Sequence, residues 1–310
     1  MTRVLVYGAG VIGQIYGGRL AQAGHDVTFL AHGRTLESLR ARGVALRTAG
    51  ATSQTAVRVV DSPREEPVPD VILVTVRRDQ VEDAIPAIAD LPARRVVFLL
   101  NLPGDLDAVR ERVGAHRTVF AFPGVGGRRE ADGTIDYVEV PQQKTTVERR
   151  GLEAPIVELL TSAGFPVDVT SDMAGWLETH AVFVTAMSAA ILACGGDSVA
   201  LADDPVQLAA MVAGIREGFR ALDRNGVNVT PAPLKLLFTA VPRFAAMRYW
   251  RKQLRGPLGT VAIAPHVRAS RETELPMLCA DVRRLVAGAG PVPHLERLLD
   301  AVAAAPPVAA

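Results

Sequence analysis

Three glycines near the start of the chain have the spacing of a phosphate-binding loop. Gly8, Gly10 and Gly13 follow the apolar run Val4–Tyr7 directly, and a helical pattern comes after them. In such a unit the first glycine makes the tight turn, the second lets the backbone approach a pyrophosphate, and the third lets helix and strand pack closely. The helix N-terminus then presents unpaired N–H groups to the phosphates. A purely structural turn is the alternative. The predicted cofactor loop comprises Gly8, Ala9, Gly10, Val11, Ile12 and Gly13.

The end of the second predicted strand indicates which dinucleotide would bind. The strand Val27–Leu30 is followed by Ala31, His32, Gly33 and Arg34, without an acidic residue. A site specific for NAD usually places Asp or Glu here to hold the ribose 2′-hydroxyl. The planar guanidinium of Arg34 is suited to a 2′-phosphate instead. We therefore predict NADPH as the cofactor, with His32 and Arg34 in its site; a solvated Arg34 is the alternative.

Further strands place polar residues at the same edge of the predicted sheet. The runs Asp70–Val76 and Arg95–Leu100 are almost continuously apolar, as in strands that are buried on both faces of a parallel sheet. Ligands of such sheets bind beyond the carboxyl ends of the strands. A Gly-rich segment, Pro123–Gly127, follows another predicted strand and adds Gly126 to the cofactor site. Loops from four strand ends should converge on one crevice, and they carry Gly8, Arg34, Arg77 and Asn101.

The sequence pattern changes near residue 170. Before this point strand and helix patterns alternate, whereas afterwards apolar residues recur at helical spacing, as in Trp176–Ile191 and Leu208–Leu222. We therefore expect an α/β fold with an N-terminal Rossmann-type doubly wound sheet and a mostly α-helical C-terminal domain. Residues 1–170 would bind NADP, and residues 171–310 would serve substrate binding and dimerisation.

Composition argues against several classes of protein. The 310 residues carry a formal net charge of +1, which gives no indication of binding to nucleic acid or membranes. Two cysteines in apolar surroundings fit a reducing compartment. A first core strand at residue 4 leaves no room for a signal peptide, and no apolar run appears long enough to span a bilayer. We expect a cytoplasmic enzyme with a small-molecule substrate and no metal, since no Cys, His and Asp cluster has metal-ligand spacing.

Together these residues resemble the ketopantoate reductase (2-dehydropantoate 2-reductase) family over nearly the whole chain. The matches beyond the glycine loop are Arg77, where the family usually has lysine, Asn101 followed by Gly104, Trp176, and Arg271–Leu275, which resembles the family's R-x-T-E-[IL] segment. The resemblance implies an NADPH-dependent reductase of a 2-oxo acid, often a dimer, with a Rossmann domain and a helical domain. It also implies that Glu274 lies near the cofactor and the active site.

The chain departs from this family at the substrate positions. The family's catalytic lysine, two residues after the tryptophan, is replaced by Glu178, and two asparagines further along the helix by Val182 and Ala186. A serine twelve residues before the conserved glutamate is replaced by Ala262. The Glu178 carboxylate would repel the carboxylate of a 2-oxo acid, so we expect a substrate other than ketopantoate. The predicted substrate-binding positions are Asn101, Val182, Ala186 and Ala262.

Reduction of a carbonyl or an imine also needs a proton donor. The candidates are Glu274, from the family motif; Glu178, which occupies the lysine position; and His180, which titrates in the right range. Structural alternatives are an exposed helix glutamate for Glu178 and a core residue for His180, which shares a face with Trp176 and Phe183.

Three functions are compatible with these residues. The first is an NADPH-dependent reductase of a 2-oxo acid, ketone or imine other than ketopantoate. The second is a genuine 2-dehydropantoate 2-reductase in which another group replaces the lysine. The third is an NADP-binding protein without redox turnover, such as a sensor or a non-redox catalyst.

Overall fold

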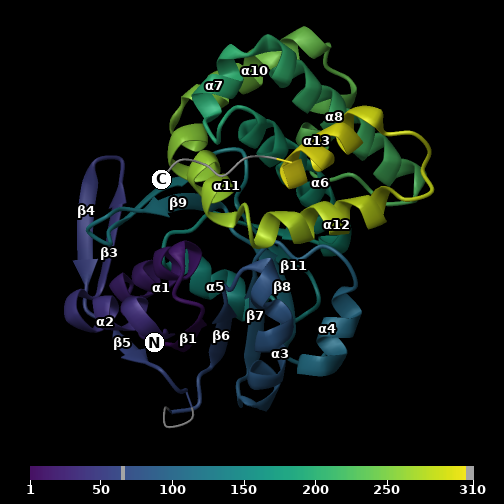
Figure 1. Cartoon of the computed structure of the whole chain (residues 1–310). Helices are drawn as coiled ribbons and strands as arrows, with labels where there is room; N and C mark the ends of the chain where they lie inside the picture. Colours follow the sequence, from purple (N-terminus) through teal and green to yellow (C-terminus); the bar gives the residue numbers. More distant parts are fainter. Residues whose placement is uncertain (64–66, 305–310) are drawn as a thin grey trace. The chain divides into compact units, whose positions relative to one another are not determined.

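The computed structural model describes residues 1–63 and 67–304, which form two compact units (Figure 1). The first unit comprises Met1–Leu100 and Asp105–Met173, and the second comprises Asn101–Gly104 and the chain from Ala174 onward. The predicted domain boundary, after residue 170, lies three residues before the end of the first unit. The sequence did not predict that the short segment after Leu100 groups with the second unit.

The main sheet of the first unit confirms the predicted fold class. Its strand order is β12-β11-β8-β7-β6-β1-β2-β5, and all neighbours are parallel except β8 and β11. The chain starts in the interior of the sheet at β1 and builds outward on both sides, which makes the sheet doubly wound. The strands are β1 Arg3–Tyr7, β2 Asp26–Leu30, β5 Arg58–Val60, β6 Val71–Val74, β7 Arg95–Leu99, β8 Thr118–Phe122, β11 Thr145–Glu148 and β12 Val167–Thr170.

Helix α1 packs closely on this sheet because its inner side carries small residues. A Cβ atom built on Gly17 would lie 2.4 Å from the ring of Phe29, so helix and strand could not pack so closely with a larger residue there. Ile15 and Leu20 of α1 are fully buried in the apolar core that includes Phe29. The helical segments of this unit are α1 Val11–Gln22, α2 Gly33–Arg42, the 3-10 helix η1 Arg78–Gln80, α3 Val81–Asp90, α4 Leu106–Val113 and α5 Ala154–Ser162.

A second sheet of four strands, which the sequence did not predict, lies in the same unit. Its order is β4-β3-β10-β9, with bounds β3 Val44–Thr48, β4 Ala51–Thr55, β9 Val125–Arg129 and β10 Ile135–Glu139. The segment from Ile135 to Val147, expected to be antiparallel strand, is divided: β10 pairs with β9, and β11 with β8. Gly126 lies within β9, opposite Val138, and not in a loop.

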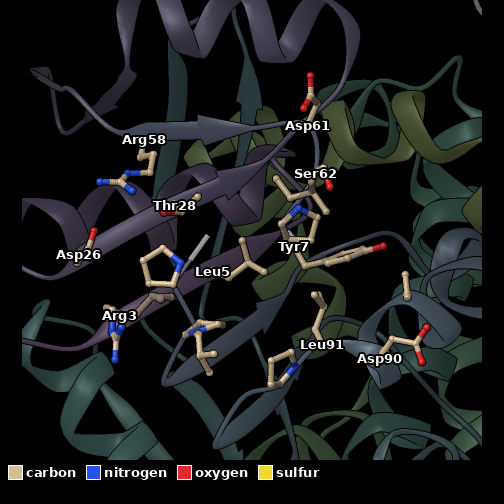
Figure 2. A pocket seen from close by; sticks show the side chains of 18 of the residues that line it. Arg3, Leu5, Tyr7, Asp26, Thr28, Arg58, Asp61, Ser62, Asp90 and Leu91 are labelled. Carbon is tan, nitrogen blue, oxygen red and sulfur yellow. The ribbon is translucent and has the colours of Figure 1, made fainter. Parts of the chain in front are cut away.

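The connection from β5 to β6 contains no helix among its described residues, and a pocket of about 580 Å³ lies beside it. Figure 2 shows Leu5 and Thr28 of the sheet in its middle, with Arg3 and Asp26 toward one end and Tyr7 and Ser62 toward the other. Parallel strands are usually joined by a helix that covers the sheet, so the pocket occupies the place of a missing helix. None of Gly8, Gly10 and Gly13 lines it, and it is therefore distinct from the predicted phosphate loop.

The second unit is helical and has an apolar core of its own. Contrary to the expectation from sequence, α6 is long and apolar enough to cross a membrane by length and composition. However, 78% of its most apolar window is buried within the protein, as for the core helix of a soluble fold. The helices are α6 Met173–Ala193, α7 Ser198–Asp203, α8 Pro205–Arg224, α9 Ala232–Thr239, α10 Arg243–Arg255, the π-helix η2 Leu258–Ile263, α11 Ala264–Ser270, α12 Glu274–Val286 and α13 Pro293–Ala304.

Glu148 on β11 is expected to be important for the stability of the first unit. Its carboxylate accepts a hydrogen bond from the buried guanidinium of Arg110, and its other oxygen accepts one from Phe120 N at 3.2 Å. Glu148→Ala would leave the buried Arg110 with Asp107 as its remaining carboxylate partner and Phe120 N without its acceptor, and loss of these hydrogen bonds to a charged group should cost about 1.5–3 kcal/mol. Urea unfolding measures the loss. Lys144→Ala, which breaks an exposed pair with Asp168, should cost about 1 kcal/mol or less. Equal losses would contradict this account.

Candidate functional site

The glycine loop between β1 and α1 has the shape of a phosphate cradle. Gly8 has φ +114°, and a Cβ atom there would lie 2.9 Å from the backbone of Thr75 and Val76. At Gly13 a Cβ atom would lie 2.1 Å from Gly8 O, whereas at Gly10 it would have no neighbour within 4 Å. Two glycines therefore let the protein pack, and the third leaves open space at the N-terminus of α1. This open space at a helix N-terminus fits a pyrophosphate.

Three residues that the sequence analysis did not single out hold this loop in shape. Thr75, directly after β6, donates a hydrogen bond from Oγ1 to Gly8 O at 2.6 Å. The buried Gln14 of α1 donates from Nε2 to Ala9 O at 2.9 Å, and Arg129 of β9 donates from Nη2 to the same oxygen at 3.3 Å. The loop carbonyls are thus occupied by protein donors, which leaves the loop N–H groups for an anion.

Arg129 brings a positive charge to the glycine loop. Among the described residues it has no carboxylate partner within ion-pair distance, and partial desolvation, together with the nearby charge of Arg42, lowers the pKa of its guanidinium. Arg129 is exposed to solvent, and a cation beside another cation is stabilised by a bound anion. Its sequence signal was weak, because Arg128 and Arg129 together resemble an ordinary charged strand end.

The end of β2 leads into a second helix N-terminus. Helix α2 begins at Gly33, its N-cap His32 makes no side-chain hydrogen bond to the helix, and its first turn contains no acidic residue. His32 and Arg34 are both exposed. The guanidinium of Arg34 and the positive end of the helix dipole can therefore act on the same anion. This geometry suits a phosphate on the ribose better than a hydroxyl.

Arg77 lies at the same edge of the sheet but is already engaged. Its guanidinium donates to both carboxylate oxygens of Asp79, at 3.0 Å each, and its backbone N–H donates to Gln80 Oε1 at 3.2 Å. Because β2, β1 and β6 are adjacent and parallel, Arg34, Gly8 and Arg77 follow three neighbouring strand ends. The expected convergence of loops thus has a basis within the first unit.

Asn101, the fourth expected loop residue, is grouped with the second unit. Its side-chain oxygen Oδ1 is buried and accepts no hydrogen bond from any described residue. A buried acceptor without a donor costs free energy unless a ligand or water satisfies it. Asn101 therefore remains a predicted contact for a ribose or substrate hydroxyl.

The predicted site positions on helix α6 differ in their burial. Val182 and Ala186 are both 0% exposed and belong to the apolar core of the second unit. Val182 packs so tightly against α8 that a Cβ atom on Gly218 would lie 2.4 Å from it. Glu178, one turn earlier, is half-buried. The geometry therefore argues against direct substrate contact by Val182 and Ala186.

His180 is half-buried on α6 among aromatic rings. It stacks on Trp176 at a centroid distance of 5.2 Å and meets the edge of Phe183 at 5.9 Å. Desolvation, with a smaller contribution from the charge of His266, lowers the pKa of His180 to about 3. The ring is then neutral at physiological pH, which argues against His180 as a proton donor and favours its reading as a packed residue.

Glu274 begins α12, and its side chain is almost completely buried. Its Oε2 lies 3.5 Å from Nε2 of His266, which the sequence analysis did not single out. His266 belongs to α11, which directly continues the π-helix carrying Ala262. Ala262 is buried, with 6% of its surface exposed, and offers no polar group. The second unit thus pairs one predicted site residue, Glu274, with an imidazole.

Comparisons with known proteins agree with the fold. Residues 4–150 match the family model described as ketopantoate reductase PanE/ApbA. A 2-dehydropantoate 2-reductase of Pyrococcus horikoshii is 25% identical over 243 residues, which are 76% of this chain and 78% of that protein. Among solved structures, a PanE/ApbA family ketopantoate reductase from Ralstonia eutropha has a TM-score of 0.76 at 22% identity, covering 97% of each chain. A D-mandelate dehydrogenase solved with NADH and anilino(oxo)acetate has a TM-score of 0.75 at 15% identity, again covering 97% of each chain.

Proposed function

This chain carries a ketopantoate reductase PanE/ApbA family domain over residues 4–150, and we propose that it is an NADPH-dependent oxidoreductase of a 2-oxo acid, ketone or imine other than ketopantoate. The observation that carries the proposal is the glycine loop. Gly8 and Gly13 are constrained by packing, while Gly10 leaves open space at the N-terminus of α1. A merely structural turn needs the packing glycines but has no need of the open one.

NADPH, when bound, supplies the hydride, and the protein supplies binding, orientation and a proton. The N–H groups at the start of α1 bind the pyrophosphate, and Arg34 binds the 2′-phosphate. The unpaired Oδ1 of Asn101 accepts a hydrogen bond from a ribose or substrate hydroxyl. The absence of an acidic residue in the first turn of α2 supports NADPH over NADH.

The proposed substrate class rests on the residue types at three positions of α6. Glu178 stands at the family's lysine position, and the two asparagine positions hold the core residues Val182 and Ala186. The polar groups that would hold ketopantoate are therefore missing. The D-mandelate dehydrogenase structure contains NADH together with anilino(oxo)acetate, the anilide of oxalic acid, in which a carbonyl next to the carboxylate bears an aromatic substituent as in an aryl 2-oxo acid. We infer a 2-oxo acid with an apolar substituent, and ketones and imines as further acceptors.

Arg129→Ala is expected to weaken NADPH binding by roughly 10- to 100-fold, since charge-assisted hydrogen bonds contribute about 1.5–3 kcal/mol. The reason is its position at the glycine loop without a carboxylate partner among the described residues. Calorimetric titration measures the dissociation constant. Arg128→Ala is the matched control, because the neighbouring arginine pairs with Glu130 and Asp136 and should leave binding unchanged. Similar affinities for both variants would contradict the role of Arg129.

The proposed function is tested by NADPH oxidation with a panel of 2-oxo acids, ketones and imines that includes ketopantoate. We expect turnover of aryl or branched-alkyl 2-oxo acids, slow or absent turnover of ketopantoate, and weak activity with NADH. Ketopantoate as the best substrate would make the protein a genuine 2-dehydropantoate 2-reductase. Tight NADPH binding without any turnover would favour the non-redox alternative.

We further propose that the protein is a cytoplasmic homodimer. Size-exclusion chromatography with light scattering tests the oligomeric state.

A further inference from the structure

We propose that His266 is the residue that protonates the substrate's carbonyl oxygen, and that Glu274 positions its ring. This inference rests on the proposed reductase function and names the proton donor that replaces the family's lysine. It is carried by a contact within the second unit, where Nε2 of His266 lies 3.5 Å from Oε2 of Glu274.

The surroundings of the pair suit proton transfer. The Glu274 side chain is 6% exposed and fixed at the start of α12, whereas the His266 side chain is 48% exposed. The buried carboxylate can hold the ring through Nε2, which leaves Nδ1 for the substrate. The exposed part of the ring allows water to return the proton after each turnover.

A π-helix precedes the helix that carries His266 and helps to position its side chain. The six residues Leu258–Ile263 form a π-helix that continues into α11. A Cβ atom on Gly259 would lie 2.1 Å from Leu254 O, so the close packing of this segment requires glycine. Short π-helical insertions occur frequently at functional sites, where they change the direction of the following side chains.

Other side chains of the second unit are poorly suited to the role. His180 is neutral because its pKa is lowered to about 3. The two lysines in the described part of this unit lie elsewhere: Lys235 pairs with Asp223, and Lys252 is an exposed residue of α10. Glu178 would have to be protonated before it could donate. His266 is the remaining imidazole that touches a residue of the family motif.

The proposed reduction transfers one hydride and one proton to the carbonyl group. The hydride and its electron pair form the new C–H bond at the carbonyl carbon, and the carbonyl π electrons move to oxygen. That oxygen takes the proton from Nδ1 of the His266 imidazolium, which becomes neutral. Solvent then reprotonates the ring. The sum is one carbonyl, one NADPH and one proton converted to one alcohol and one NADP⁺.

Several charged groups surround the imidazole. Glu274 faces it from α12, and the neutral ring of His180 lies on α6. The residues of η2, Leu258–Ile263, carry no charge. On its own helix, Arg268 turns to donate to Gly196 O at 2.7 Å, and Arg271 and Glu272 follow in the turn before Glu274. The imidazole of His266 therefore faces the Glu274 carboxylate at close range.

The test compares His266→Ala with His116→Ala, which removes an exposed histidine of the first unit. Loss of a general acid typically costs about 10²–10⁴-fold. We expect His266→Ala to lower the single-turnover rate of hydride transfer by this factor, with NADPH affinity and melting temperature unchanged. Added imidazole should restore part of the rate in His266→Ala only. In the wild-type protein, kcat/KM should fall on the alkaline side with the midpoint of the His266 titration followed by NMR without cofactor.

The outcomes separate this inference from the proposed function. No turnover by the wild-type protein with any carbonyl overturns the proposed function. Turnover by the wild type together with an unchanged rate in His266→Ala overturns the role of His266 and leaves the reductase standing. Should the variant unfold, the wild-type comparison still decides, because a kinetic midpoint that differs from the NMR titration of His266 excludes it as the proton donor. Glu274→Gln should lower kcat with little change in KM for NADPH, as expected of a positioning residue.

Discussion

Gly10→Val is expected to abolish NADPH binding while leaving the fold intact. Gly10 has φ −74°, which any residue adopts, and a Cβ atom there has no neighbour within 4 Å. The valine side chain therefore fits the unliganded protein and occupies the space that the pyrophosphate needs. We expect an affinity loss of at least about 100-fold, or about 2.7 kcal/mol. The melting temperature should stay within about 2 °C of the wild-type value, since the stability change should be under about 0.5 kcal/mol.

Gly13→Val is the matched comparison for this experiment. A Cβ atom on Gly13 would lie 2.1 Å from Gly8 O and 2.6 Å from Thr75 Oγ1, so this variant should lose both stability and binding. Calorimetric titration with NADPH and thermal unfolding, applied to both variants, separate the two roles. NADPH binding by Gly10→Val with wild-type affinity would show that the pyrophosphate does not lie over this loop.

Arg34→Glu is expected to reverse the cofactor preference. The variant replaces the proposed 2′-phosphate ligand at the N-terminus of α2 with the carboxylate that NAD-specific sites use for the 2′-hydroxyl. Loss of a charge-assisted contact costs about 1.5–3 kcal/mol, so NADPH should bind roughly 10- to 100-fold more weakly. NADH should bind equally well or better. Dissociation constants for both nucleotides give the ratio directly.

Arg40→Glu provides the control, because it changes the same charge on the same helix at its other end. Arg40 is exposed and lies 3.9 Å from Asp61, so its loss should leave the preference for NADPH unchanged. If Arg34→Glu and Arg40→Glu changed the NADPH affinity equally, the effect would reflect net charge and not a contact with the 2′-phosphate.

Local sequence patterns were sufficient for the central parallel strands of the main sheet. The apolar run Val71–Val74 and the glycine spacing after β1 predict buried strands and a strand–turn–helix unit from a few adjacent residues. The hairpin β3–β4 gave no such signal, since the residues of β4, Ala51–Thr55, are mostly exposed and polar. The separation of β10 from β11 also escaped prediction, because sheet membership depends on long-range pairing.

The predicted site residues also differ in whether local sequence or long-range packing determines their roles. Gly8, Gly10 and Gly13 are adjacent in sequence, and their roles follow from one turn. Residues 178, 182 and 186 share helical spacing, yet Val182 and Ala186 face the core because α8 packs against this side of α6. His266 could not be predicted, since its contact with Glu274 depends on the π-helix and on the turn between α11 and α12.

Transfer of deuterium from NADPH labelled at the nicotinamide C4 position tests the central claim most directly. The wild-type protein would be incubated with both C4-deuterated epimers of NADPH and with aryl and branched-alkyl 2-oxo acids. Mass spectrometry of the products detects the label. This account predicts a 2-hydroxy acid that carries one deuterium from a single epimer, and loss of this product in Gly10→Val. Binding of NADPH without deuterium in any product would contradict the assignment as a reductase.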